Sequence, residues 1–270
     1  RIHMNWIRVL GNTGIEVSAL GLGTVKLGRN EGVKYPGNFT IPDDQAATRL
    51  LSQARELGIN LIDTAPAYGS SEERLGKLLK GQRNQWVICS KVGEEFEQGV
   101  SHFDFSPEHT RASVQRSLER LDTEMIDMVL IHSDGNDQRI IEELGTLQAL
   151  AELKSEGLIR AFGMSTKTVA GGRAAAQQAD IVMLTYNLAQ REEEAVLNTC
   201  AELGKGAIIK KALASGHLTQ DCEDPIQASM DLVLGHPGTG AAIIGTITPK
   251  HLRANVEAAH QTLNKQARSN

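Results

Sequence analysis

Short apolar runs alternate with amphipathic segments along most of the chain. The runs have the length of buried strands and lie at roughly 17–23, 59–63, 86–91, 126–131, 159–163, 181–185, 206–210 and 241–245. Between them, apolar residues recur at helical spacing over 43–57, 107–121, 137–155 and 249–263. The pattern therefore predicts a repeated strand–helix unit.

Turn and cap residues limit these elements. Apolar runs at 6–10 and 15–20 flank a Gly-Asn-Thr-Gly turn at 11–14, which predicts an N-terminal β-hairpin. The Ser-Pro pair at 106–107 opens one helix, the serines at 70–71 supply a cap for another, and Gly157 closes a third. The elements should therefore begin and end close to these positions.

Eight strand–helix units in about 250 residues match the size of a parallel (β/α)8 TIM barrel. The alternative is a doubly wound open sheet, which needs a glycine fingerprint and a helix directly after its first strand. Glycines stand at 21 and 23, but Lys26 occupies the third position, and no helix is expected there at once. An α/β barrel is therefore favoured. No composition break divides residues 4–270, so a single domain is expected, with residues 1–3 interpreted as a vector remnant.

Charge and composition exclude several classes of protein. The 28 basic and 33 acidic side chains give a net charge of −5 without long runs, which argues against nucleic-acid binding. With 40% apolar residues the chain can form a core, but no segment reaches the ~18–20 apolar residues of a membrane span. Cys89, Cys200 and Cys222 are widely spaced and odd in number, so no disulfide framework is predicted. No signal peptide is recognised, and a cytoplasmic location is expected.

Three predicted strands end in an ionisable residue, namely Asp63, Lys91 and His132. Neighbouring barrel strands lie ~4.8 Å apart and end at the same edge, so these side chains should fall within a ~10 Å arc. Tyr68 follows Asp63 by five residues, beyond a Pro-induced loop, and can fold back over it. The carboxyl edge of the barrel is therefore the candidate site.

This group of side chains suits protonation of a carbonyl oxygen while a hydride reaches the attached carbon. A phenol with a pKa near ~10 is a reluctant acid at neutral pH. A lysine ammonium beside Tyr68 would stabilise the phenolate and ease proton release. Asp63 would keep Lys91 charged and oriented. A neutral His132 would hydrogen-bond the substrate oxygen.

Each of the four residues also has an ordinary structural interpretation. Asp63 could cap a loop, and Lys91 could be a solvated charge at a strand end. His132 could be a structural histidine, and Tyr68 a loop aromatic with its hydroxyl in water. Their coincidence at one edge favours the catalytic interpretation. The other histidines lack metal-ligand spacing, so no metal site is expected.

These motifs resemble those of the aldo-keto reductase family over about residues 7–259. The most specific match is the segment 58–65 followed by Tyr68 and Gly69. The resemblance implies the barrel already favoured and a nicotinamide dinucleotide, usually NADPH, bound without a Rossmann fold. It also implies a catalytic tetrad, with Tyr68 as proton donor, consisting of Asp63, Tyr68, Lys91 and His132.

The resemblance further implies a set of cofactor-binding residues. They are Gly23, Thr24, Ser165, Thr166, Lys210, Leu213, Ser215, Gly216, Gly245, Thr246, His251 and Asn255. Thr166 stands where the family has an Asn that meets the nicotinamide amide, and Met183 stands where Gln is common. Lys210 occupies roughly the position of an aromatic that stacks on nicotinamide. The usual nicotinamide contacts are therefore altered.

The last strand and helix resemble the family's clamp for the adenosine phosphate, although Thr248-Pro249 is also an ordinary helix start. Family members commonly carry a lysine near the position of Gly245 and an arginine near that of His251, and both are missing. We therefore expect NADP to be preferred less strongly than is usual, with NAD remaining an alternative.

The candidate site together with the family resemblance implies an NAD(P)-dependent oxidoreductase acting on an aldehyde, ketone or sugar, or on the corresponding alcohol. Its partners would be a small carbonyl substrate and the dinucleotide, without nucleic acid or membrane. One alternative is a nucleotide-binding redox sensor or regulatory barrel with little turnover, which the altered nicotinamide contacts keep open. Another is a different barrel enzyme, such as an isomerase.

Overall fold

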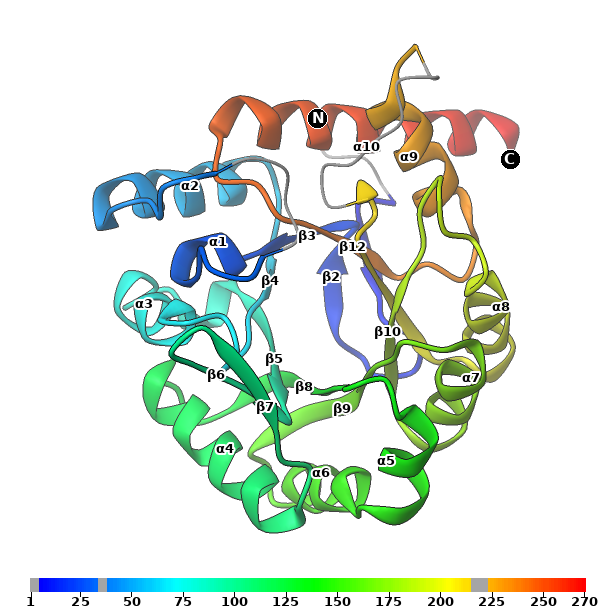
Figure 1. Ribbon diagram of the computed structural model, residues 1–270. Helices are drawn as coiled ribbons and strands as arrows, with labels where there is room; N and C mark the ends of the chain where they lie inside the picture. The colour runs from blue at the N-terminus through cyan, green and yellow to red at the C-terminus, as the bar shows by residue number, and fades with distance from the viewer. Residues whose placement is uncertain (1–4, 34–37, 215–222) are drawn as a thin grey trace.

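The computed structural model describes residues 5–33, 38–214 and 223–270. Its centre is a closed barrel of parallel strands surrounded by helices (Figure 1). In order around the barrel the strands are β3 (Leu20–Gly23), β4 (Leu61–Asp63), β5 (Val87–Val92), β8 (Ile126–His132), β9 (Ile159–Ser165), β10 (Ile181–Thr185), β11 (Gly206–Lys210) and β12 (Ala241–Ile244). Pairing of β12 with β3 closes the ring, which excludes the open sheet and confirms the (β/α)8 barrel.

The helices form the outer layer of the barrel. They are α1 (Val25–Gly28), α2 (Asp44–Glu56), α3 (Ser71–Leu78), α4 (Pro107–Arg120), α5 (Asp137–Glu143), α6 (Thr146–Ser155), α7 (Val169–Gln178), α8 (Glu194–Leu203), α9 (Pro225–Gly235) and α10 (Pro249–Ser269), with a 3-10 turn, η1 (Arg83–Gln85). Side-chain caps start several of them. Ser106, for example, accepts a hydrogen bond from the N–H of His109 and precedes the first-turn proline of α4.

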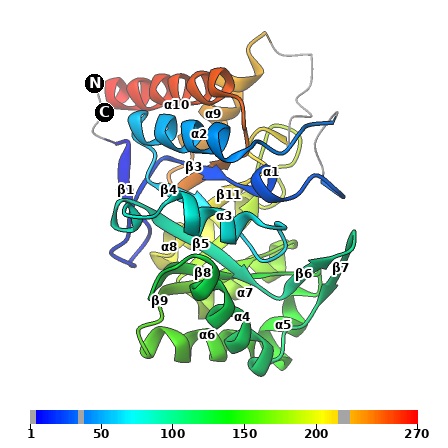
Figure 2. The same cartoon turned by 90° about the vertical axis from the view of Figure 1, so that its left-hand side faces the viewer.

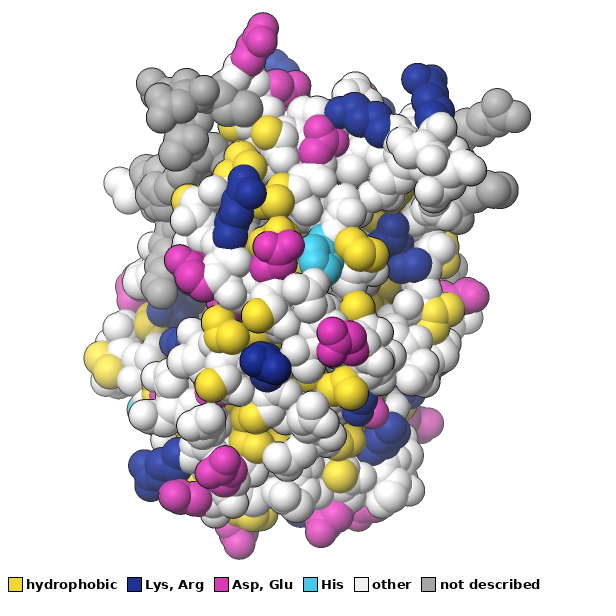
Figure 3. Space-filling view, turned by 90° about the vertical axis from the view of Figure 1, so that its right-hand side faces the viewer, with side chains coloured by type: hydrophobic (Ala, Val, Ile, Leu, Met, Phe, Trp, Pro, Cys, Tyr) yellow, Lys and Arg dark blue, Asp and Glu magenta, His cyan; other side chains and the backbone are white. Residues whose placement is uncertain are grey.

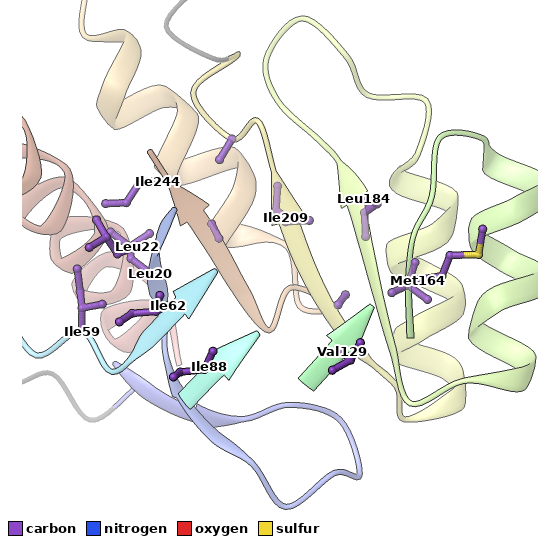
Figure 4. Close-up of a cluster of buried hydrophobic side chains, with 14 of the residues drawn as sticks. Leu20, Leu22, Ile59, Ile62, Ile88, Val129, Met164, Leu184, Ile209 and Ile244 are labelled. Atoms are coloured by element: carbon purple, nitrogen blue, oxygen red, sulfur yellow. The ribbon is translucent and has the colours of Figure 1, made fainter. Parts of the chain in front are cut away.

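Strand alternation divides the core into two layers. Outward-facing residues such as Leu22, Ile62 and Ile88 pack between the strands and the helices (Figure 4). Inward-facing residues fill the barrel itself, and those from the strands include Leu61, Cys89, Leu130, Met183 and Ile208. The barrel is therefore a packed core, and polar side chains can gather only at its ends.

Two hairpins lie at opposite ends of the barrel (Figure 2). β1 (Ile7–Val9) and β2 (Glu16–Ser18) form the predicted N-terminal hairpin. Val17 of β2 and the flanking Leu10 and Ile15 join the interior cluster. β6 (Glu94–Glu97) and β7 (Val100–Phe103) form the second hairpin, which the apolar pattern did not predict. The second hairpin follows β5 directly and therefore borders the candidate site.

Three helix predictions need correction. The segment 137–155 is two helices, α5 and α6, because Gly145 adopts a φ of +75° that an α-helix cannot contain. A short helix, α1, does follow β3 at once, although it lacks the third fingerprint glycine. α10 continues beyond Leu263 to Ser269, since the residues that follow are good helix formers.

Acidic and basic side chains are interspersed on the face that carries α7 and α8 (Figure 3), in line with the nearly balanced composition. Within the described residues, no helix is both long and apolar enough to cross a membrane. Over the same ranges, no group of three His, Cys, Asp or Glu side chains could hold a metal ion. Cys89 and Cys200 are buried thiols without a disulfide, and Cys222 lies outside the described residues.

Candidate active site

Polar or ionisable residues occupy the carboxyl ends of six barrel strands. On β5, Lys91 shares the alternation of the inward-facing Cys89, and the other strands repeat this pattern. The inward-facing end residues are Asp63, Lys91, His132, Ser165, Thr185 and Lys210. All six are buried or half-buried, so they form a polar layer on top of the apolar barrel core.

Asp63 and Lys91 form a buried ion pair on the neighbouring strands β4 and β5. The Lys91 Nζ donates a short hydrogen bond to the Asp63 carboxylate and another, of 3.0 Å, to the carbonyl oxygen of Thr64. Lys91 is 1% exposed. Burial is the largest single influence and would lower the pKa of Lys91, but Asp63, Cys89 and Tyr68 together outweigh it, and the pKa lies above its ordinary value. Lys91 therefore stays positively charged inside the site.

Tyr68 lies on the loop after β4, with its ring 5.8 Å from the Lys91 Nζ. Its loop is held by close backbone contact with α1. A Cβ added to Gly28 would lie 2.1 Å from the carbonyl oxygen of Tyr68, and one added to Gly69 would lie 1.9 Å from the carbonyl oxygen of Gly28. Gly69 also has a φ of +59°. These two glycines permit the approach that brings the phenol over Lys91.

A second layer of hydrogen bonds fixes the ends of β4 and β5. The Thr24 hydroxyl donates to the carbonyl oxygen of Asp63 at 2.7 Å and lies 2.8 Å from the hydroxyl of Ser71. The Ser90 hydroxyl donates to Glu72 at 2.8 Å, and Glu72 is fully buried. Asp63 and Lys91 are thus positioned through α3, which begins at Ser71. Ser70 makes no capping hydrogen bond there, contrary to expectation.

His132 completes the group at the end of β8. Its ring is edge-on to that of Tyr68, with centroids 5.9 Å apart. Its buried Nδ1 lies 3.3 Å from a carboxylate oxygen of Glu94, but without the geometry of a hydrogen bond. Burial, followed by the positive charge of Lys91, lowers the pKa of His132 well below its ordinary value. The imidazole is therefore neutral at physiological pH.

Lys210 spans the opposite half of the barrel mouth. Its Nζ donates to the Ser165 hydroxyl at 2.8 Å and to the carbonyl oxygen of Thr166 at 3.0 Å. Burial lowers the pKa of Lys210 to about 7, while Glu193 opposes the shift. An aromatic ring could not make these hydrogen bonds. The chemistry of this half of the mouth thus differs from that of an apolar stacking platform.

The other cofactor-binding predictions divide into three groups. Gly23 and Gly245 lie together at the ends of β3 and β12, since a Cβ added to Gly23 would be 3.5 Å from the Cα of Gly245. Thr24 and Asn255 are buried, and the hydroxyl of Thr24 is engaged within the fold. The third group belongs to the loop that follows β11. Leu213 is partly buried, whereas Ser215 and Gly216 lie outside the described residues.

The start of α10 lacks a side-chain cap and could hold an anion. Thr248 occupies the N-cap without a capping hydrogen bond, and the first turn contains no acidic residue. Thr246 accepts from the N–H of Thr248, and His251 is exposed on the first turns. Free N–H groups at a helix start attract phosphate. The polar mouth of the barrel and this helix start together fit a dinucleotide, with the ring end and the phosphate end at separate places.

Three charged residues near the site were not predicted. Arg29 follows α1, donates to the carbonyl oxygen of Ala67 at 3.1 Å and lies over the ring of Phe96. Glu94 approaches His132, and Glu193 balances Lys210. Glu94 stands just beyond a strand end, a position that could have identified it. Arg29 and Glu193 lie on connecting segments, where the sequence pattern carries no such signal.

A separate depression of ≈740 Å³ lies at the amino end of the barrel, near Asn60 and Trp86. Its two arginines are both paired with Asp127, Arg83 at 2.8 Å and Arg160 at 3.1 Å. Glu16 also lines the depression, so its two arginines are balanced by two carboxylates and it is poorly suited to binding an ionic ligand. The carboxyl edge remains the candidate active site.

Comparisons with known proteins identify relatives of the chain. The model of the aldo/keto reductase family matches residues 19–232. The crystal structure of a putative aldo-keto reductase from Pseudomonas aeruginosa has a TM-score of 0.88 and 56% identity, covering 95% of each chain. The holo form of an aldo-keto reductase from Bacillus halodurans has a TM-score of 0.80 at 27% identity, covering 97% of this chain and 96% of its own. The NADH-specific methylglyoxal reductase of Escherichia coli is 34% identical over 226 residues, which are 78% of this chain and 68% of that protein.

Proposed function

The chain belongs to the aldo/keto reductase family, whose members are nicotinamide-dependent oxidoreductases of carbonyl compounds, and we propose that it reduces a small aldehyde, ketone or sugar with Tyr68 as the proton donor. The observation that carries the proposal is the position of Lys91. A buried ammonium, held by Asp63, lies 5.8 Å from the Tyr68 ring, beside a neutral His132.

The geometry supports a division of labour among the four residues. The substrate's carbonyl oxygen would lie between Tyr68 and His132, and the neutral imidazole would donate a hydrogen bond that orients it. As the carbonyl carbon gains a hydride, the oxygen gains negative charge and takes the proton of Tyr68. The phenolate that remains is stabilised by Lys91, which Asp63 keeps charged. Solvent then returns a proton to Tyr68.

A nicotinamide dinucleotide would supply the hydride. Its ring end would be held at the barrel mouth by Ser165, Thr166 and Lys210. Its phosphate end would be held at the start of α10, where Thr246 and His251 lie. Two further cations, Lys250 and Arg253, are exposed on the first turns of α10 and can add positive charge for a 2′-phosphate.

NADP is therefore the proposed cofactor, with a weak preference over NAD. The positive charge at the start of α10 supports NADP, whereas the loss of the family's usual lysine and arginine weakens the preference. NAD is kept as the alternative, since one relative is named an NADH-specific reductase.

The alternative function is a sensor that binds nucleotide without appreciable turnover. It is supported by Lys210 and Thr166, which replace the family's usual nicotinamide contacts. The intact group around Lys91 favours the enzyme, because a sensor has no need of a proton-donating phenol beside a buried ammonium.

Steady-state turnover separates these two functions. The purified chain would be given NADPH or NADH with methylglyoxal, 4-nitrobenzaldehyde or glyceraldehyde, and both nucleotide oxidation and alcohol formation would be measured. Stoichiometric alcohol formation supports the reductase. Tight nucleotide binding without turnover in either direction would favour the sensor. Failure to bind either nucleotide would favour the hypothesis that the chain is a different barrel enzyme, such as an isomerase.

A further inference from the structure

Two lysines at strand ends face one another across the mouth of the barrel. In the closed ring, β11 is four strands from β5 in either direction, so Lys210 lies opposite Lys91. Lys91 is paired with the carboxylate of Asp63. The Lys210 Nζ instead donates its hydrogen bonds to the neutral oxygens of Ser165 and Thr166. The two ammonium groups therefore have different electrostatic surroundings.

The half of the mouth that contains Lys210 is the half that the hydride must come from. This step rests on the proposed function. Tyr68 and His132 hold the substrate oxygen on the side of β4 and β8, so the carbonyl carbon faces across the mouth. The nicotinamide ring must approach that carbon from the side of β9 to β11. Ser165 and Lys210 lie at the ends of β9 and β11, and their side chains border the place that the ring would occupy.

A positive charge at this place distinguishes the two redox states of the cofactor. The oxidised nicotinamide ring is a cation, whereas the reduced ring is neutral. Like charges a few ångströms apart in a partly buried site repel one another by an amount equivalent to about tenfold or more in affinity. An ammonium on Lys210 would therefore oppose the oxidised ring and leave the reduced ring unaffected.

We propose that Lys210 selects the reduced cofactor and thereby biases the enzyme towards carbonyl reduction. Its hydrogen bonds to Ser165 and Thr166 hold the ammonium at the end of β11, where an aromatic residue would carry no charge. Tighter binding of the reduced than of the oxidised nucleotide opposes the reverse reaction, because alcohol oxidation must begin from the oxidised complex.

The charge on Lys210 can also be changed by pH. Burial lowers its pKa to about 7, and the charges around it are Glu193 and Asp137, which raise the pKa, and Lys211 and Lys167, which lower it. Across the mouth, His132 is neutral, and Lys91 is compensated by Asp63. Selection should therefore be strong below neutral pH and weaken as Lys210 loses its proton.

The test is the ratio of two dissociation constants, that of the oxidised nucleotide over that of the reduced nucleotide, measured by calorimetry without substrate. In the wild type this ratio should be on the order of tenfold higher at pH 6 than at pH 9. Any contribution of His251 to the two dissociation constants cancels in their ratio, because both redox states carry the same adenosine phosphates. Lys210→Met should give the low ratio at both pH values, and Lys210→Arg should keep the high ratio at both.

Lys167→Met is the matched control, because Lys167 is a nearby but exposed cation whose effect water and salt screen. Its ratio should remain within about twofold of the wild type. Equal ratios in the wild type, Lys210→Met and Lys210→Arg would overturn the proposal. If Lys210→Met does not fold, the wild type and Lys210→Arg are sufficient for the test. The proposal is then overturned if the wild-type ratio does not change with pH and equals the ratio of Lys210→Arg at pH 9. Failure to bind either nucleotide refutes the proposed function instead.

Discussion

The ring of His132 is edge-on to the ring of Tyr68, with 5.9 Å between centroids and 81° between planes. The contact places an imidazole beside the phenol that we propose as proton donor. Because burial lowers the pKa of His132 and several nearby cations lower it further, the imidazole does not carry a competing charge. Two groups capable of hydrogen bonding to one substrate oxygen are therefore held side by side, and only one of them is proposed to give up a proton.

The first prediction concerns the protonation state of His132. Its imidazole should remain neutral between about pH 6 and pH 9, because its folded-state pKa is well below 6.5. NMR titration of the histidine signals would test this, with His132→Gln identifying the resonance. A His132 signal that titrates near its ordinary pKa would contradict the account.

The same shift has a consequence for stability. Because the pKa of His132 is lowered in the folded state, the unfolded chain binds more protons than the folded chain below about pH 6.5. The contribution of His132 to the free energy of unfolding should thus be complete above that pH and decrease as the pH falls below it. Denaturant unfolding at pH 5.5 and 7.5 should show a smaller pH dependence for His132→Gln than for the wild type.

The second prediction treats Asp63 and Lys91 as one unit. Lys91→Met removes the cation that stabilises a phenolate, so the pH limb assigned to Tyr68 should move upward and kcat should fall. Asp63→Asn should weaken the same effect. In a double-mutant cycle the combined loss should be smaller than the sum of the single losses. Strictly additive losses in kcat/KM would show that the two residues act independently.

The third prediction uses the contact between α1 and the Tyr68 loop. In Gly28→Ala, the new Cβ would lie 2.1 Å from the carbonyl oxygen of Tyr68, so the loop must move by about 1 Å. A displacement of that size at a reacting group costs on the order of 10²-fold in kcat. Nucleotide affinity should change little.

Gly235→Ala is the control for that substitution. Gly235 ends α9, and the atom nearest to an added Cβ is 4.0 Å away. Its kinetic constants should equal those of the wild type. An active Gly28→Ala enzyme with unaltered kcat would mean that the position of the Tyr68 loop does not govern the reaction.

The fourth prediction concerns the choice of dinucleotide. The open start of α10 should bind the 2′-phosphate of NADP+, and the exposed His251 can donate a hydrogen bond to it. The dissociation constant of NADP+ should therefore be lower than that of NAD+. His251→Ala should leave a smaller preference. Equal affinities for the two nucleotides, or tighter NAD+ binding, would refute the assignment.

The barrel strands were predictable because parallel strands covered on both faces are continuous apolar runs. The runs at 181–185 and 206–210 coincide with β10 and β11. The hairpin of β6 and β7 escaped prediction because its second strand is exposed along its whole length and lacks an apolar pattern. Helical spacing alone also could not separate α5 from α6, since the break depends on one backbone angle at Gly145.

The candidate site was predictable where its residues end strands. Asp63, Lys91 and His132 lie on three adjacent strands, so barrel geometry brings them together without further information. The partners of the site were not predictable in this way. Glu193 lies on a connecting segment, and its influence on Lys210 depends on how the loop after β10 returns to the mouth.

The most direct test of the account is the effect of Tyr68→Phe on carbonyl reduction, measured together with nucleotide affinity. The substitution removes one hydroxyl and keeps the ring beside Lys91 and His132. Turnover should fall by ~10²–10⁴, the usual contribution of general acid catalysis, while the dissociation constants of both dinucleotides stay within about twofold. A Tyr68→Phe enzyme that retains most of the wild-type turnover would contradict the assignment of Tyr68 as the proton donor.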